Sequence, residues 1–116
     1  MYLPWRNAVQ KVRQKTGAAE PALAVVLGSG LGEVVAGCEV LCRVGYLELE
    51  GMPTTAVSGH KGELVVGRIS DKIIWFFSGR FHLYEGYSAS EVVAPVVFAA
   101  AAGCQKVLLT NAAGAV

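Results

Sequence analysis

The sequence predicts an α/β fold with a mixed, largely parallel central sheet flanked by helices. Short apolar runs, typical of buried strands, alternate with stretches of helical periodicity. Three of these runs end in loops of small or polar residues, which is where open α/β sheets place their ligands. The 116 residues are enough for one core and require no internal domain boundary.

Composition narrows the classes of partner. Hydrophobic residues make up 53% of the chain and charged residues 16%, which is more apolar than a typical soluble domain and predicts surface that a partner covers. The longest apolar run, 92–102, contains Pro95 and is shorter than the ~20 residues that a bilayer requires, so we expect no membrane span. The net charge of +1, with basic residues clustered only before residue 16, argues against a nucleic-acid partner.

The cysteines and histidines predict neither disulfides nor a metal site. Cys38, Cys42 and Cys104 are an odd set without zinc-like spacing, and no secretory signal peptide precedes them. Free thiols and a cytoplasmic location are therefore expected. The two histidines have no carboxylates at ligand spacing, so no metal is predicted.

The first element predicted is an amphipathic helix that ends near Gly17. Trp5, Ala8, Val9 and Val12 recur at i, i+3, i+4 and i+7, with basic residues elsewhere around the helix. A membrane-surface or organelle-targeting segment would show the same pattern. We favour a surface helix that packs its Trp5 stripe on the sheet.

A buried strand over 22–27 runs directly into a glycine-rich loop. Glycines 28, 30 and 32 allow a tight turn and a close approach of backbone N–H groups to a ligand, and Glu33–Ala36 can begin a helix whose amino end favours an anion. The loop lacks the third glycine of a dinucleotide fingerprint and the ending of a Walker loop. A phosphate loop and a plain tight turn both remain open.

The middle of the chain predicts further strands. Partial alternation over 38–49 suggests a short or edge strand, and 54–57 suggests another short strand. His60 follows between small residues, where it could meet an anion or have no functional role. The runs 63–69 and 72–77 are separated by two residues, the spacing of a tight hairpin.

The stretch 78–87 concentrates polar side chains after a predicted strand. It carries Arg80, His82, Tyr84 and Glu85 within a few residues. A helix is predicted after it, from Ser88, which has capping-box spacing to an acidic residue, to Ala102, with Gly103 as the stop and a kink at Pro95.

A last strand, 106–110, leads to the small-residue loop 111–114. If the strands are largely parallel, this loop, the glycine loop and the stretch 78–87 gather at one end of the sheet. Glycine-turn N–H groups, the Arg80 guanidinium, a serine hydroxyl and imidazoles are donors that suit a phosphate. A serine hydrolase is poorly supported, because the GxSxG elbow is missing and Asp71, the sole aspartate, lies in the predicted hairpin turn.

Four segments together resemble the amino-terminal part of the trimeric purine nucleoside phosphorylases. They are GSGLG from Gly28, GH at Gly59, GRFHLYEGY from Gly79 and TNAAG from Thr110. The resemblance runs from about residue 24 to residue 114, and the last two segments are highly specific. It implies phosphorolysis of purine ribonucleosides or deoxyribonucleosides in purine salvage, with inorganic phosphate as co-substrate and no cofactor.

The resemblance also implies a role for each matching residue. Phosphate would be bound by Ser29, His60, Arg80, His82, Asn111 and Ala112. Ribose and purine would be bordered by Tyr84, Ala112, Ala113 and Gly114, and the catalytic residues would be His82 and Glu85. Family members form homotrimers, so a homo-oligomer is expected.

The sequence departs from the family where it stops, at Val116. In family members the residues that grip the purine, a second phosphate-binding serine and further ribose contacts come from the carboxyl-terminal half. Residues 1–116 therefore match the amino-terminal portion of a single phosphorylase domain, incomplete and expected to be inactive alone. Two alternatives remain: a non-catalytic phosphate- or nucleotide-binding module, and a structural half-domain that associates with other subunits.

Overall fold

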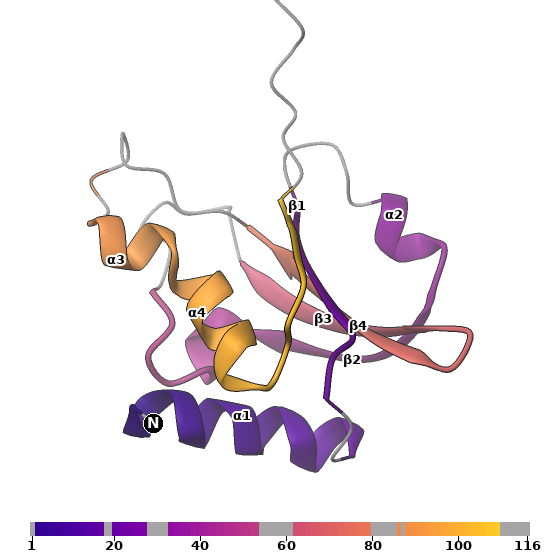
Figure 1. Cartoon of the computed structure of the whole chain (residues 1–116), viewed down its shortest axis with the longest axis horizontal. Helices are drawn as coiled ribbons and strands as arrows, with labels where there is room; N and C mark the ends of the chain where they lie inside the picture. Colours follow the sequence, from indigo (N-terminus) through magenta and orange to yellow (C-terminus); the bar gives the residue numbers. More distant parts are fainter. Residues whose placement is uncertain are drawn as a thin grey trace, which may run out of the picture.

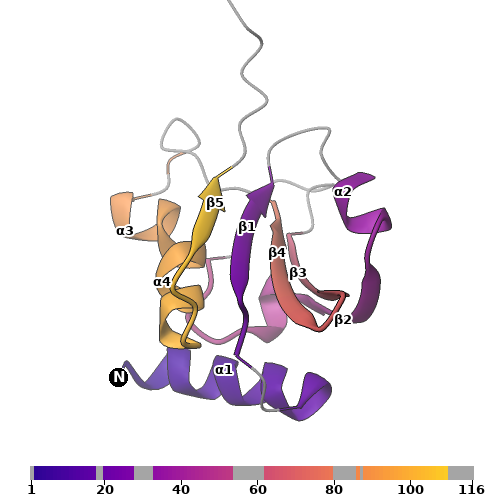
Figure 2. The same ribbon diagram turned by 45° about the vertical axis from the view of Figure 1, so that its right-hand side comes forward.

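A computed structural model describes residues 2–17, 20–27, 33–53, 62–79, 86 and 88–109. Within these residues the chain forms a five-stranded sheet in the order β2-β3-β4-β1-β5 (Figures 1 and 2). The strands are β1 (Leu23–Leu27), β2 (Glu39–Gly45), β3 (Glu63–Ile69), β4 (Lys72–Ser78) and β5 (Val107–Leu109).

The sheet is mixed, as the sequence predicts. β1 pairs in parallel with β4 on one side and with β5 on the other. β3 pairs antiparallel with both β2 and β4. Its pairing with β4 follows from a tight turn at Ser70 and Asp71, which folds β4 directly back along β3. The predicted hairpin and the predicted edge strand are both confirmed, and β2 is an edge of the described sheet. The strand predicted over 54–57 lies outside the described residues.

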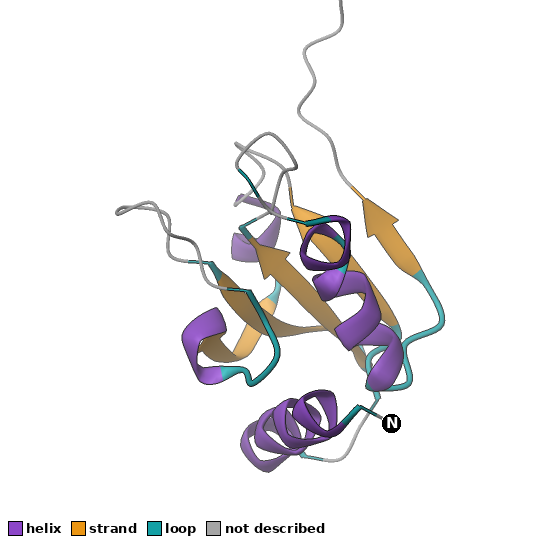
Figure 3. Ribbon diagram, turned by 90° about the vertical axis from the view of Figure 1, so that its left-hand side faces the viewer, coloured by secondary structure: helices purple, strands orange, loops and turns teal. Residues whose placement is uncertain are grey.

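Helices cover the two faces of the sheet unequally. The helical elements are α1 (Leu3–Thr16), α2 (Glu33–Ala36), the 3₁₀ turn η1 (Tyr46–Glu48), α3 (Ala89–Val92) and α4 (Ala94–Ala101). Figure 3 shows α4 across one face with α1 beneath it, and in Figure 1 the single turn α2 lies on the other side of the sheet. In the described chain no helix is long and apolar enough to cross a membrane.

β1 is buried on both faces, as its continuous apolar sequence predicts. Ala24 and Val26 face the larger core beneath α1 and α4, whereas Val25 and Leu27 face a smaller cluster that includes Val35 of α2. The strand is therefore held centrally, and its carboxyl end is fixed by packing from both sides.

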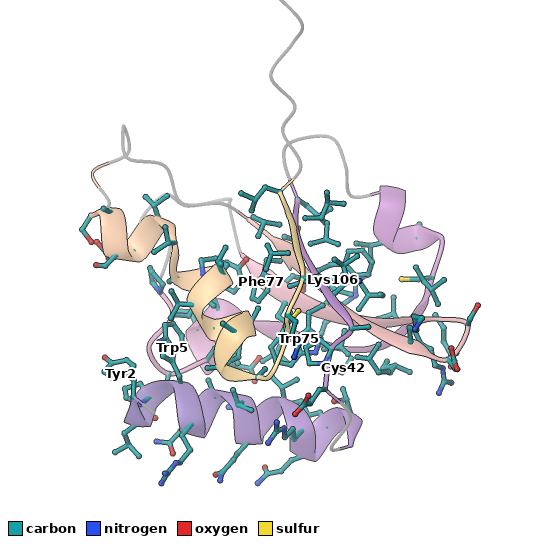
Figure 4. All side chains as sticks on the ribbon, in the orientation of Figure 1. Tyr2, Trp5, Cys42, Trp75, Phe77 and Lys106 are labelled. Carbon is teal, nitrogen blue, oxygen red and sulfur yellow. The ribbon has the colours of Figure 1, made fainter. Side chains whose placement is uncertain are left out.

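The larger core is built around aromatic rings (Figure 4). α1 buries the predicted stripe of Trp5, Ala8, Val9 and Val12. The Trp5 ring stacks on Phe98 of α4 with centroids 5.3 Å apart, and the Trp75 ring of β4 also lies 5.3 Å from the Phe98 ring. Phe98 is thus the common neighbour of both tryptophans and links Trp5 of α1 to β4.

The helix predicted from Ser88 to Ala102 is two helices, so a simple kink is the wrong description. α3 ends at Val92 and α4 begins at Ala94, with Val93 between them at φ −92° and ψ 1°. Pro95 stands in the first turn of α4, where its missing N–H costs nothing. The proline ring also crowds the carbonyl four residues back, that of Glu91, so α3 cannot continue unbroken through Pro95.

The start of α3 has the predicted capping box. The Ser88 hydroxyl accepts a hydrogen bond from the Glu91 N–H at 3.3 Å, and the Ser88 N–H donates to the Glu91 carboxylate at 3.0 Å. We expect Ser88→Ala to lower the free energy of unfolding by ~1 kcal/mol, because an orphan N–H of the first turn loses its acceptor. Urea denaturation measures this, and Ser88→Asp, which restores an oxygen acceptor, should recover most of the loss. Equal stability of Ser88→Ala and the parent would contradict the cap.

Candidate phosphate site at the strand ends

The residues predicted to bind phosphate, ribose and purine all lie outside the described part of the chain. This holds for Ser29, His60, Arg80, His82, Tyr84, Glu85, Asn111, Ala112, Ala113 and Gly114. The structure does describe the strand ends to which these segments are joined. Those strand ends therefore define the candidate site.

The ends of four strands lie together at one end of the sheet. Leu27, the last residue of β1, pairs with Ser78, the last residue of β4. Glu63, the first residue of the antiparallel β3, pairs with the same Ser78, and Leu109 at the end of β5 pairs with Val26. β3, β4, β1 and β5 are consecutive in the sheet, and neighbouring strands are spaced ≈ 4.8 Å apart, so the four ends span about 15 Å.

The ends of β1, β4 and β5, from which the three predicted loops start, lie together as the sequence predicts. The start of β3 joins them as a fourth strand end. Because β3 runs antiparallel to β4, β3 begins at the end of the sheet where the other three strands finish. Ser29 follows Leu27 by two residues, Arg80 directly follows Gly79, Asn111 follows Leu109 by two, and His60 precedes Gly62 by two. The chain therefore enters or leaves each of the predicted ligand segments at this one end of the sheet.

Tyr46 of η1 joins two of the four ends and is the residue that sequence reasoning missed. Its hydroxyl donates a hydrogen bond to the Gly79 carbonyl at 2.9 Å, and its backbone N–H donates to the Gly62 carbonyl at 3.1 Å. The side chain is buried, with 3% of its surface exposed. No local pattern signals this role, because Gly62 and Gly79 lie 16 and 33 residues further along the chain.

The surroundings of Tyr46 keep its hydroxyl neutral. Burial, and secondarily the negative charge of Glu63, raises the pKa of Tyr46 far above its ordinary value of 10.0. The Glu63 carboxylate is itself paired with Arg43, whose Nη1 lies 2.6 Å from it. The hydroxyl therefore remains a hydrogen-bond donor to Gly79 well into the alkaline range.

This pKa makes stability depend on pH on the alkaline side. The unfolded chain releases the Tyr46 proton near pH 10 whereas the folded chain keeps it, so stability is full below pH 10 and falls as the pH rises above it. We expect the wild type to lose up to ~1.4 kcal/mol more than Tyr46→Phe for each pH unit above 10. Urea unfolding of both proteins at pH 9, 10 and 11 measures this, and parallel declines would contradict it.

A surface hollow of about 600 Å³ lies away from the four strand ends, beside the turn between β3 and β4. It is lined by Lys15, Thr16, Leu41, Arg68, Ser70, Asp71 and Ile73. Although two cations border it, Arg68 is engaged by the Glu39 carboxylate at 2.9 Å, and Asp71 adds a further negative charge. These paired and opposing charges make the hollow a poor site for phosphate.

Comparison with known proteins agrees with the resemblance seen in the sequence. Purine nucleoside phosphorylase 1 of Geobacillus stearothermophilus is 37% identical over 110 residues, which cover 95% of this chain and 40% of that protein. The purine nucleoside phosphorylase of Mycobacterium leprae is 42% identical over 110 residues, covering 94% of this chain and 41% of the relative. The chain thus spans about 40% of the length of the curated relatives it matches.

Solved structures show the same fold. The purine nucleoside phosphorylase of Schistosoma mansoni in complex with acetate superposes with a TM-score of 0.83 at 30% identity, covering 97% of this chain and 41% of that one. A purine nucleoside phosphorylase in complex with ribose-1-phosphate gives a TM-score of 0.81 at 31% identity over 95% of this chain and 40% of that one. The family model described as "Phosphorylase superfamily" matches residues 22–116, and the chain belongs to that superfamily.

Proposed function

We propose that this chain serves purine nucleoside phosphorolysis and supplies the side of the active site that binds phosphate and ribose. The observation that carries the proposal is the meeting of four strand ends at one end of the sheet, each within three residues of a predicted phosphate ligand along the chain. Its relatives named purine nucleoside phosphorylase support the same reaction.

In the proposed reaction, a phosphate oxygen forms a bond to the anomeric carbon of the nucleoside while the bond from that carbon to the purine nitrogen breaks. The purine takes the electron pair and then a proton, and the sugar leaves as ribose 1-phosphate. Positive charge develops on the ribosyl group, so a phosphate dianion held beside it both stabilises the charge and supplies the nucleophile.

The proposed roles follow the donors each residue carries. Arg80 would hold the phosphate through its guanidinium fork, with Ser29, His60 and His82 as further donors. The loop 111–114 would complete the cradle and border the purine, and Tyr84 would face the ribose. Glu85 would orient these groups, and no metal or organic cofactor is needed because inorganic phosphate is the co-substrate.

The whole assembly is also part of the proposal. Residues 1–116 would form the amino-terminal portion of one α/β phosphorylase domain, and the groups that stabilise the departing purine would come from residues beyond this match. We propose a cytoplasmic protein that acts as a homotrimer when the domain is whole.

The test follows hypoxanthine release from inosine and phosphate. We expect the 116-residue chain to bind inorganic phosphate, measured by isothermal titration calorimetry, and to show no robust turnover by itself. Mixing it with the carboxyl-terminal portion of a relative should restore turnover. Robust turnover by the chain alone would contradict the division of the site, and phosphate binding without turnover in any mixture would favour a non-catalytic module.

A second candidate, a half-domain that associates with other subunits, is favoured by the exposed edge strand β5. Val107, Leu108 and Leu109 are 36%, 51% and 59% exposed, and in the described sheet β5 pairs on one side only. An apolar edge of this kind is a template for pairing with another chain.

The exposed edge strand β5 leads to a separate prediction. We expect Leu108→Lys to shift the elution of the protein towards the monomer in size-exclusion chromatography, because a charge on an edge strand opposes strand pairing. Arg80→Ala should leave elution unchanged while it weakens phosphate binding. Identical elution of Leu108→Lys and the parent, both as monomers, would exclude association through β5.

A further inference from the structure

We propose that Tyr46 is a positioning residue that sets the distance between Gly62 and Gly79, the described residues next to the segments that carry His60 and Arg80. This inference rests on the proposed function. It differs from the roles assigned above because Tyr46 itself would touch neither phosphate nor nucleoside.

Tyr46 donates two hydrogen bonds, one from its side chain and one from its backbone. Its hydroxyl fixes the carbonyl of Gly79, the residue immediately before Arg80, at 2.9 Å. Its backbone N–H fixes the carbonyl of Gly62, two residues after His60, at 3.1 Å. A single residue from η1 thereby anchors the origins of two segments that carry predicted phosphate ligands.

The two anchored residues are glycines for a steric reason. Gly62 lies so close to the Tyr46 ring that a Cβ at this position would overlap ring atoms. A Cβ on Gly79 would approach the Gly62 Cα to 2.9 Å, and the positive φ of Gly79, 113°, already disfavours any side chain. The ring and the two glycine backbones are therefore packed directly on one another, and any change of ring position must move a strand end.

Tyr46 itself has little freedom to move. It is buried in the larger core with Leu49, Met52 and Phe77. Because the Tyr46 hydroxyl donates to the Gly79 carbonyl at 2.9 Å, the position of Gly79 is fixed relative to that core. This is the arrangement expected of a group that holds ligand-bearing segments in place for an anion.

Tyr46→Phe tests the role because it removes one hydroxyl and keeps the ring. We expect the dissociation constant for inorganic phosphate, measured by calorimetry on the 116-residue chain, to rise about five- to tenfold, the value of one hydrogen bond. Amide hydrogen exchange of a peptide covering 79–87 should accelerate in the same variant, whereas a peptide covering 54–62 should change less, because the Tyr46 backbone N–H still donates to the Gly62 carbonyl. Gly62→Ala, which displaces the ring, should have the larger effect on both readouts.

Val12→Ala is the matched control. Val12 is fully buried on α1, and Figure 1 shows α1 at the opposite end of the sheet from the carboxyl ends of β1 and β5. Truncation of Val12 lowers stability and leaves the two hydrogen bonds donated by Tyr46 in place. It should leave phosphate affinity and the exchange of both peptides unchanged at a temperature where it is folded. An equal loss of affinity in Val12→Ala and Tyr46→Phe would reduce Tyr46 to a general stabilising residue and overturn the inference.

The outcomes separate this inference from the function on which it rests. If the wild type binds phosphate and Tyr46→Phe binds it equally well with unchanged exchange, the positioning role is wrong and the proposed function stands. If the wild type binds no phosphate, the proposed function fails and the positioning of phosphate ligands fails with it. Weakened phosphate binding by Tyr46→Phe together with accelerated exchange of the peptide 79–87 supports the role.

Discussion

Phe98→Ala is expected to lower the free energy of unfolding by about 3–5 kcal/mol, enough to unfold a large fraction of a marginally stable domain. Phe98 is fully buried and is the ring that Trp5, Trp75 and Phe77 share, at centroid distances of 5.3, 5.3 and 6.1 Å. Its removal opens a cavity between α1, α4 and the sheet and removes three aromatic pairs at once.

Urea denaturation followed by tryptophan fluorescence measures this loss, since both tryptophans of the chain contact Phe98. Phe98→Leu is the control, because it refills much of the volume and should cost well under half as much. A loss below ~1 kcal/mol for Phe98→Ala would show that α4 is not held by this cluster.

Arg80→Ala is expected to weaken the binding of inorganic phosphate by at least about 100-fold. Arginine can donate two charge-assisted hydrogen bonds to one phosphate, and such bonds contribute about 1.5–3 kcal/mol each. Calorimetric titration at fixed ionic strength measures the change, and Arg80→Lys should recover only part of it because the fork is lost.

Lys15→Ala is the charge-matched control for Arg80→Ala. It removes the same positive charge, but from the hollow beside the β3–β4 turn and not from the strand ends. Phosphate affinity should remain within about twofold of the wild type, because a distant exposed charge is largely screened. Equal losses in the two variants would point to non-specific attraction and would contradict a site at Arg80.

Much of the fold follows from short-range patterns in the sequence. The stripe that begins at Trp5 has helical period, and α1 buries it; the unbroken apolar run of β1 corresponds to burial on both faces. The spacing of the β3–β4 hairpin and the cap at Ser88 depend on residues two or three positions apart, so the sequence alone suffices for them.

Features that depend on distant contacts could not be predicted in this way. The sequence predicts only a kink at Pro95; that the helix breaks at Val93 and a second helix begins at Ala94 is seen only in the structure. The clamp of Tyr46 on Gly62 and Gly79 joins three separate stretches of chain, and an irregular local pattern around Tyr46 gives no sign of it. The predicted ligands, from Ser29 to Gly114, stay predictions because they lie outside the described residues.

The central claim is that inorganic phosphate binds where the four strand ends meet. A ¹H–¹⁵N correlation spectrum of the 116-residue chain, titrated with phosphate at constant ionic strength, tests it most directly. We predict saturable shifts at the described amides that border the site, those of Leu27, Gly62, Gly79 and Leu109, and in the segments that follow or precede them. Shifts confined to the hollow around Lys15 and Arg68, or no saturable shifts at all, would contradict the claim.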